Sequence, residues 1–233
     1  MSAAAASPSL LSSLPARVDV LRRLDDVVWG SLLLVVAAAS MVGAAMADQA
    51  GRQAMRLLGD QSFIGLEYPV LGVQEFCPLV TALVLAQRVG AGFSAELSSL
   101  IADGTWDAQL LYNTRPIQRR IVPMGLALPI GTLVLSVVAV VVWELGGILV
   151  MMLRSNINPF TFFHPEVVTP SLLGLLCAKS LVFGACIFAG AVSAAMTTRA
   201  HGDVGRATTD AVVRGTLLCL VFNLAFDVAW FLA

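Results

Sequence analysis

Long apolar stretches dominate the pattern of hydrophobic and polar positions along the chain, and each can form a membrane-crossing helix. We predict five of them, at residues 27–47, 63–100, 121–152, 170–197 and 207–233. A helix needs about 20 apolar residues to cross the hydrocarbon layer, because each residue adds about 1.5 Å. The pattern therefore predicts an all-α integral membrane protein with five transmembrane helices.

Residues 9–26 carry a different pattern, in which Leu and Val recur three or four positions apart with Arg and Asp between them. Such a stripe predicts an amphipathic helix that lies in the membrane interface. We therefore divide the chain into residues 1–26, a tail and interfacial helix, and residues 27–233, one membrane domain. Residues 1–15 have no Lys or Arg ahead of an apolar core, so no cleavable signal peptide is expected.

Composition agrees with this class and excludes others. Hydrophobic residues make up 58% of the 233 positions and charged residues 12%, whereas a soluble domain has about 45–50% apolar and about 25% charged residues. The 14 Lys and Arg residues and 15 Asp and Glu residues leave a net charge of −1. Because no basic field is present to hold phosphates, we expect no nucleic-acid partner.

The arginines are distributed unevenly between the links that join the apolar stretches. Alternate links carry most of them, namely Arg17, Arg22, Arg23, Arg115, Arg119, Arg120, Arg199, Arg206 and Arg214. The other links carry Arg52, Arg56 and Arg154. The positive-inside rule then predicts a cytoplasmic N-terminus, and five crossings place the C-terminus on the far side of the membrane.

The sequence has no recognisable catalytic or metal-binding motif. It contains no G-x-x-x-x-G-K-[ST] loop for nucleotide phosphates, and no nucleophile can be matched with a base on these helices. The four cysteines lie in apolar stretches without zinc spacing, and His164 and His201 fall in loops predicted on opposite sides. We therefore expect a non-enzymatic chain with no metal site and no cofactor of its own.

A few charges lie within the apolar stretches, where they are costly and usually face a bundle interior or a cavity. Arg88 and Glu96 are eight positions apart, within about 80° on a helix. Together with Glu75 they predict either a salt-bridge ladder that fixes helix packing or the lining of a cavity. Lys179, the only lysine, either extends to the interface or pairs with one of these acids, and Asp227 is expected in the outer headgroup zone.

Residues 103–111, between the second and third predicted helices, form a segment that is too polar to cross the membrane. The residues that would form its first turns are Asp103, Gly104, Thr105, Trp106, Asp107 and Ala108. The neighbouring arginines place the segment on the cytoplasmic side. Two interpretations remain open: a coupling helix that docks into an ATPase, or an ordinary connecting helix.

Several motifs, taken in order, resemble a known family. They are Glu75-Phe76-Cys77-Pro78-Leu79-Val80-Thr81-Ala82-Leu83, Arg88-Val89-Gly90, Ala95-Glu96-Leu97, residues 116–123, Lys179-Ser180 and residues 205–213. Their order and spacing are similar to those of MlaE/YrbE-type permeases, the membrane subunits of ABC transporters that move lipids between the membranes of diderm bacteria and serve Mce systems. The resemblance covers residues 27–233.

The resemblance implies a permease in the bacterial inner membrane, with residues 103–108 as the coupling helix. Two such permeases would form a lipid-binding cavity at their interface, with an MCE-domain protein on the periplasmic side. An ABC ATPase would be a separate partner chain that holds ATP and Mg. The substrate implied is a phospholipid or another hydrophobic molecule. By resemblance, Glu75, Arg88, Glu96 and Lys179 would support the cavity or the conformational switch.

The chain also departs from the family pattern. Gly104 and Thr105 replace a Glu-Gln pair of the coupling segment, Cys77 replaces a Gly, and Asn223 stands where an Asp often occurs. These departures suggest a divergent subunit that pairs with a second, non-identical permease. Two alternatives from other classes are an ion-coupled secondary carrier that uses the membrane charges and a scaffold subunit that does not transport.

Overall fold

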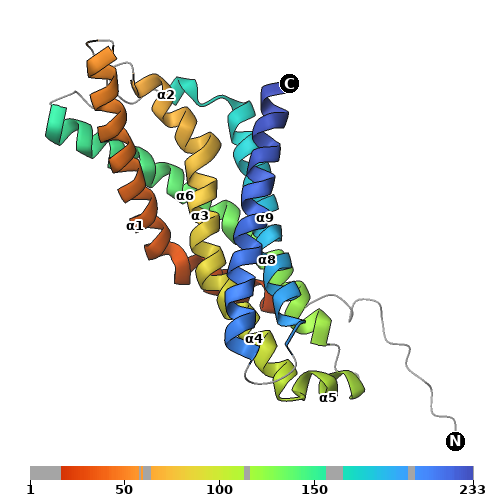
Figure 1. Cartoon of the computed structure of the whole chain (residues 1–233). Coiled ribbons are helices and arrows are strands. Elements are labelled where there is room, and N and C mark those ends of the chain that lie inside the picture. The colour runs from red at the N-terminus through yellow and green to blue at the C-terminus, as the bar shows by residue number, and fades with distance from the viewer. Residues whose placement is uncertain are drawn as a thin grey trace, which may run out of the picture.

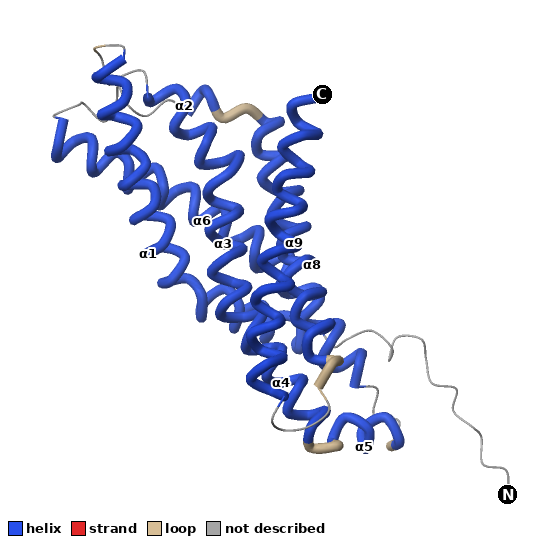
Figure 2. Tube along the Cα trace, viewed as in Figure 1, coloured by secondary structure: helices blue, strands red, loops and turns tan. Residues whose placement is uncertain are grey.

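The computed structural model describes residues 17–57, 59, 64–112, 116–155, 165–198 and 203–232. All regular elements within these residues are helices, as Figures 1 and 2 show. Five of the helical segments are long and apolar enough to cross a membrane: Asp19–Leu57, Gly65–Ala102, Ile117–Arg154, Pro170–Ala195 and Val204–Leu232. The all-α class and the five predicted spans are therefore confirmed.

The elements follow one another with short links. The helices are α1 (Arg17–Leu57), α2 (Ile64–Leu71), α3 (Cys77–Leu85), α4 (Ala91–Ala102), α5 (Thr105–Leu111), α6 (Val122–Ser155), α8 (Pro170–Ala195) and α9 (Val204–Leu232). Three π-helical turns, η2 (Gly72–Phe76), η3 (Ala86–Gly90) and η4 (Ile117–Ile121), and the 3₁₀ turn η5 (Pro165–Val167) complete the described structure. Helices α2, α3 and α4 with η2 and η3 together form the second span.

Helix α1 contains residues predicted to form an interfacial helix as well as the residues of the first predicted span. It runs without interruption over 41 residues, so residues 17–26 of the predicted interfacial helix are continuous with the first span. Figure 1 shows these red turns lying crosswise behind the other helices before α1 continues along the bundle. The tail at residues 1–16 lies outside the described residues. The boundary at residue 26 is therefore no helix end.

An aromatic stack joins α6 to the second span near the end of the bundle opposite α5. The Trp143 ring lies 5.1 Å from the Tyr68 ring and 5.1 Å from the Phe76 ring, centroid to centroid. The Tyr68 hydroxyl donates a hydrogen bond of 3.0 Å to the Trp143 carbonyl oxygen. Gly72 makes this approach possible, because a Cβ there would lie 2.6 Å from the Trp143 indole nitrogen.

The outer surface of the bundle is apolar, as expected for contact with lipid. The spans nevertheless differ in how far the rest of the chain covers them. In Gly65–Ala102 and in Pro170–Ala195, 50% of the most apolar window is buried, compared with 11% in Val204–Leu232. Helix α9 is therefore the least covered span and exposes an almost complete apolar face.

Candidate functional site

The side chain of Lys179 lies at the centre of a polar cluster between α8, η2 and α9. Its Nζ atom lies 2.8 Å from Glu75 Oε1 and 2.5 Å from Asp227 Oδ1. It also lies 3.0 Å from the carbonyl oxygen of Gln74 and 3.2 Å from Asn223 Oδ1. Four oxygens thus surround an ammonium group whose side chain is 0% exposed. We call Glu75, Lys179, Asn223 and Asp227 the Lys179 cluster.

The local sequence explains why the Gln74 carbonyl is available to Lys179. In a regular helix this carbonyl would accept a hydrogen bond from the backbone nitrogen of residue 78, four positions later. Pro78 has no N–H, and the preceding residues form the π turn η2, in which the Cys77 N–H bonds to the Gly72 carbonyl. The proline therefore removes the N–H that this carbonyl would meet in a regular helix, and the Lys179 ammonium group donates a hydrogen bond to it.

Asn223 links the two carboxylates of the cluster on the side away from Lys179. Its amide nitrogen donates to Glu75 Oε2 at 2.9 Å and to Asp227 Oδ2 at 3.0 Å. An Asp at position 223 would add a third carboxylate and would provide no N–H donors. The departure from the family pattern at this position therefore has a local reason, since two carboxylates already face one lysine.

The cluster is sealed on one side and open on the other. Lys179 is fully buried, whereas the side chains of Glu75 and Asp227 are 24% and 33% exposed. Lys179 is the tenth residue of α8, so it lies about 13 Å along the helix from its start. Its depth and complete pairing match the usual arrangement of functional charges in membrane segments. The open edge offers carboxylate oxygens to whatever covers the bundle there.

Two sequence-based expectations about these residues can be compared with the geometry. Lys179 pairs with an acid across the bundle, so the alternative of a side chain that extends to the interface is wrong. Asp227, expected in the outer headgroup zone, has a carboxylate that is 33% exposed and bound to the buried Lys179. The Gln74 carbonyl was not predicted as a partner of Lys179, and the signal that could have indicated it is Pro78, four positions later.

Glu96 and Arg88 lie elsewhere, and the predicted ladder that joins them to Glu75 is wrong. Arg23 donates two hydrogen bonds, of 3.0 Å and 2.8 Å, to the two carboxylate oxygens of Glu96. Arg120 donates a third, of 3.0 Å, to Glu96 Oε1. Glu96 on α4 therefore ties the start of α1 to η4.

Arg88 is held against α1 by a separate contact. Its Nη1 atom donates to Ser31 Oγ at 2.8 Å. Gly30 provides the space for this arrangement, because a Cβ at that position would overlap the guanidinium group. Within the described part of the chain Arg88 makes no ion pair, so its charge is positioned by a hydroxyl and by packing.

A short helix forms where the sequence predicts one between the second and third spans. Helix α5 begins at Thr105, directly after Gly104, whose φ of +69° favours glycine. The glycine in place of the family's Glu thus makes the turn between α4 and α5. Trp106 is buried against Leu97 and Ala195 and so anchors α5 to the bundle. Asp103 and Asp107 are exposed, while Ala108 is half-buried.

These features define a multi-pass membrane protein with a buried ion-pair cluster between its helices. The described residues bring no group of three or more metal-ligating side chains together. The family described as Permease MlaE matches residues 20–229. The chain therefore belongs to the MlaE permease family, whose related proteins are named as ABC transporter permeases.

The related proteins are similar over most of their length. A probable ABC transporter permease protein of Synechocystis is 29% identical over 217 residues, which cover 92% of this chain and 81% of that protein. One from Rickettsia typhi is 28% identical over 207 residues, covering 88% and 80%. A third, from Pyropia yezoensis, is 25% identical over 207 residues, covering 87% and 77%.

Proposed function

We propose that this permease binds a lipid in a cavity that it forms with a second permease subunit in the inner membrane of a bacterium. An MCE-domain protein on the periplasmic side exchanges lipid with the cavity, and a separate ABC ATPase, which binds ATP and Mg, drives the cycle. Family membership supports the ABC transporter, and the half-open Lys179 cluster beside the poorly covered α9 is the observation that supports the cavity.

The surface around the cluster has the chemistry that an amphipathic ligand requires. Several large apolar side chains of α9 are exposed: Leu217, Leu220, Val221, Leu224 and Val228. They lie on the same helix as Asn223 and Asp227, so an apolar wall adjoins a polar edge. A second permease packed on this face would enclose both. Acyl chains would contact the apolar wall and the headgroup would meet the polar edge.

The Lys179 cluster also suggests how this cavity changes shape. It joins η2, α8 and α9 through one ammonium group, so a shift of α9 must break or rearrange the contacts to Asn223 and Asp227. At the other end, Glu96 ties α4 to α1 and η4 close to α5. An ATPase that moves α5 would therefore act on helices that are linked by buried and half-buried ion pairs.

The interaction with the ATPase would use the outer face of α5. Trp106 holds the inner face, whereas Leu110 and Leu111 are 47% and 86% exposed. Exposed leucines on a short helix at the end of a membrane bundle offer an apolar contact for a cleft in a partner protein. Asp107 beside them adds a charge for polar contacts.

Copurification with lipid analysis tests this proposal. We expect the tagged chain, extracted from its native membrane in mild detergent, to carry an ABC ATPase, an MCE-domain protein and bound lipid in mass spectrometry. A permease dimer of this chain alone would contradict the heteromeric arrangement. Absence of any ATPase, together with substrate uptake driven by an ion gradient, would favour the secondary carrier, to which a buried Lys179 between two carboxylates is also suited.

A variant separates the transporter from a scaffold. Lys179→Met is expected to abolish lipid-stimulated ATP hydrolysis by the complex while the subunits stay associated. If the chain is a scaffold, this variant should still associate with the other subunits and should show the cellular phenotype of the wild type. Arg154→Met, which removes an exposed arginine paired with Asp48, is the matched control and should leave hydrolysis unchanged.

A further inference from the structure

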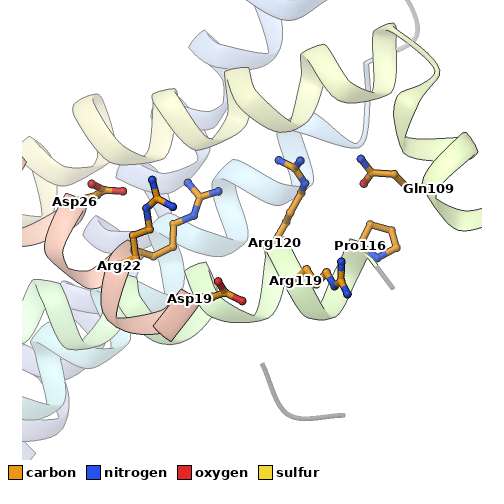
Figure 3. Close-up of a pocket in the computed structure, with 8 residues that line it drawn as sticks. Asp19, Arg22, Asp26, Gln109, Pro116, Arg119 and Arg120 are labelled. Carbon is orange, nitrogen blue, oxygen red and sulfur yellow. The ribbon is translucent and has the colours of Figure 1, made fainter. Parts of the chain in front are cut away.

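A large cavity with charged walls lies at the end of the bundle that carries α5. Its volume is about 680 Å³, and α1, α5 and η4 contribute its walls. The charged residues that line it are Asp19, Arg22, Arg23, Asp26, Arg119 and Arg120. Figure 3 shows the labelled lining residues, which come from α1, α5 and the segment that begins at Pro116. The Lys179 cluster lies at the opposite end, near the start of α8, so the cavity is a separate site.

Glu96 divides the four arginines into two pairs. Arg23 and Arg120 bind the Glu96 carboxylate, which neutralises part of their charge and holds them in place. Arg22 and Arg119 are exposed, and in the described part of the chain neither makes an ion pair. Two guanidinium groups thus face the cavity with their hydrogen-bond donors free, a suitable arrangement for the oxygens of a phosphate.

Asp19 and Asp26 give the same cavity the opposite charge. They are exposed on α1, one turn to either side of Arg22. They too make no ion pair within the described residues. Carboxylates would repel a ligand with only negative charge, but they accept hydrogen bonds from an ammonium group. A cavity with both signs therefore suits a ligand that carries a phosphate and an amine.

The position of the cavity indicates that this ligand belongs to a lipid. A second cavity of about 240 Å³ shares Arg23 and Asp26 with the first, and Arg88 and Glu96 also line it. Its apolar lining comes from Val27, Val89, Phe93 and Met124. On the outside, Leu126 and Ile130 of α6 are 48% and 42% exposed, about two and three turns beyond Arg119. Acyl chains therefore have apolar surface beside the charged site, which a soluble phosphate would not need.

We propose that this cavity binds the headgroup of a phospholipid that carries a phosphate and a primary amine, from the leaflet at the α5 end of the bundle. Arg22 and Arg119 bind the phosphate, and Asp19 and Asp26 accept hydrogen bonds from the ammonium group. The bound lipid bridges α1 and η4, next to the Glu96 contacts that join the same elements. This site goes beyond the proposed transport function and does not depend on which lipid is transported.

Native mass spectrometry of the full chain in detergent tests this proposal. Phosphatidylethanolamine, phosphatidylglycerol and phosphatidylcholine with identical acyl chains are titrated separately. The wild type is expected to bind phosphatidylethanolamine most tightly, because phosphatidylglycerol has no amine and the amine of phosphatidylcholine has no N–H. Equal binding of all three lipids would overturn the assignment of the headgroup.

Paired variants locate the binding. Arg22→Ala with Arg119→Ala should weaken binding of phosphatidylethanolamine about thirtyfold, since each surface arginine near a headgroup contributes a factor of about five. The matched control, Arg52→Ala with Arg56→Ala, removes two exposed arginines at the other end of α1 and should change nothing. Asp19→Asn with Asp26→Asn should abolish the preference for phosphatidylethanolamine over phosphatidylglycerol.

Three outcomes would overturn the proposal. The first is an Arg22 and Arg119 variant that is folded, as judged by circular dichroism, and binds phosphatidylethanolamine as the wild type does. Soluble phosphoethanolamine could bind as tightly as the lipid, which would make the ligand a free metabolite. The variant could lose only ATPase association and keep the lipid, which would make the cavity a protein docking site. Lipid binding is measured on the permease alone and ATPase association in a separate pull-down, so none of these results depends on transport.

Discussion

Replacement of Lys179 by Met tests most directly how the buried cluster contributes to the protein. Met has a similar length and no charge, so the main loss is the ammonium group between Glu75 and Asp227. Removing one partner from a buried ion pair costs about 3–5 kcal/mol, because the remaining charge stays desolvated. Here the carboxylates are 24% and 33% exposed, so water compensates in part and we expect a cost of about 2–3 kcal/mol.

The expected loss can be measured as a shift in thermal unfolding. For a chain of this size, 1 kcal/mol changes Tm by about 2–4 °C, so Lys179→Met should lower Tm by about 4–12 °C in detergent. The triple variant with Glu75→Gln and Asp227→Asn removes the unpaired charges and should recover most of this loss. Its lipid-stimulated ATP hydrolysis should remain absent, because stability returns but the ionic link does not.

A control on α9 separates this effect from a general loss of charge. Arg214→Met removes an exposed arginine whose distance to Asp210 is 3.7 Å, and such surface pairs contribute little. Its Tm should stay within about 2 °C of the wild type. The reasoning would be refuted if Lys179→Met unfolded at the wild-type temperature, or if the triple variant were less stable than the single one.

Three further variants test other contacts. Glu96→Gln should release the start of α1, because two arginines lose their carboxylate partner at a cost of about 1–2 kcal/mol. Amide hydrogen exchange there should rise at least fivefold, and unchanged exchange would contradict this. Gly30→Ala should displace the Arg88 guanidinium and lower Tm by a few degrees. The control Gly92→Ala has open space around its Cβ position and should leave Tm unchanged. Equal effects would show that the approach of Arg88 to Gly30 is unimportant. Trp106→Ala should detach α5 from the bundle, since a buried Trp contributes about 3 kcal/mol or more to stability. ATPase binding in a pull-down should fall at least tenfold, and wild-type binding would exclude this anchoring role.

The ladder predicted for Arg88 and Glu96 failed for a reason that can be located. It assumed about 100° of rotation per residue along one regular helix. The π turn η3, at Ala86–Gly90, contains Arg88 and has a wider hydrogen-bond spacing. The residues after it are therefore rotated relative to a continuous α-helix. Arg88 then faces α1, and Glu96 meets arginines from α1 and η4.

The sequence by itself determined the all-α class, the five spans and the position of α5. Each of these follows from local properties: the length of an apolar run, the polarity of a short segment, or a glycine at a turn. Pro78 also indicates that the Gln74 carbonyl lacks its regular helical donor, although its partner Lys179 does not follow from this. Family membership was also accessible, because motif order and spacing are properties of the chain itself.

Only the tertiary structure decided which charges meet. Lys179 and Glu75 are 104 positions apart, and Arg23 and Glu96 are 73 positions apart. Such pairs depend on the depth and rotation of two separate helices, and these are set by packing at places such as Gly30 and Gly72. The cavity between α1, α5 and η4 has the same origin. Because a charged side chain in a membrane protein must find its partner across the bundle, its role depends on that packing.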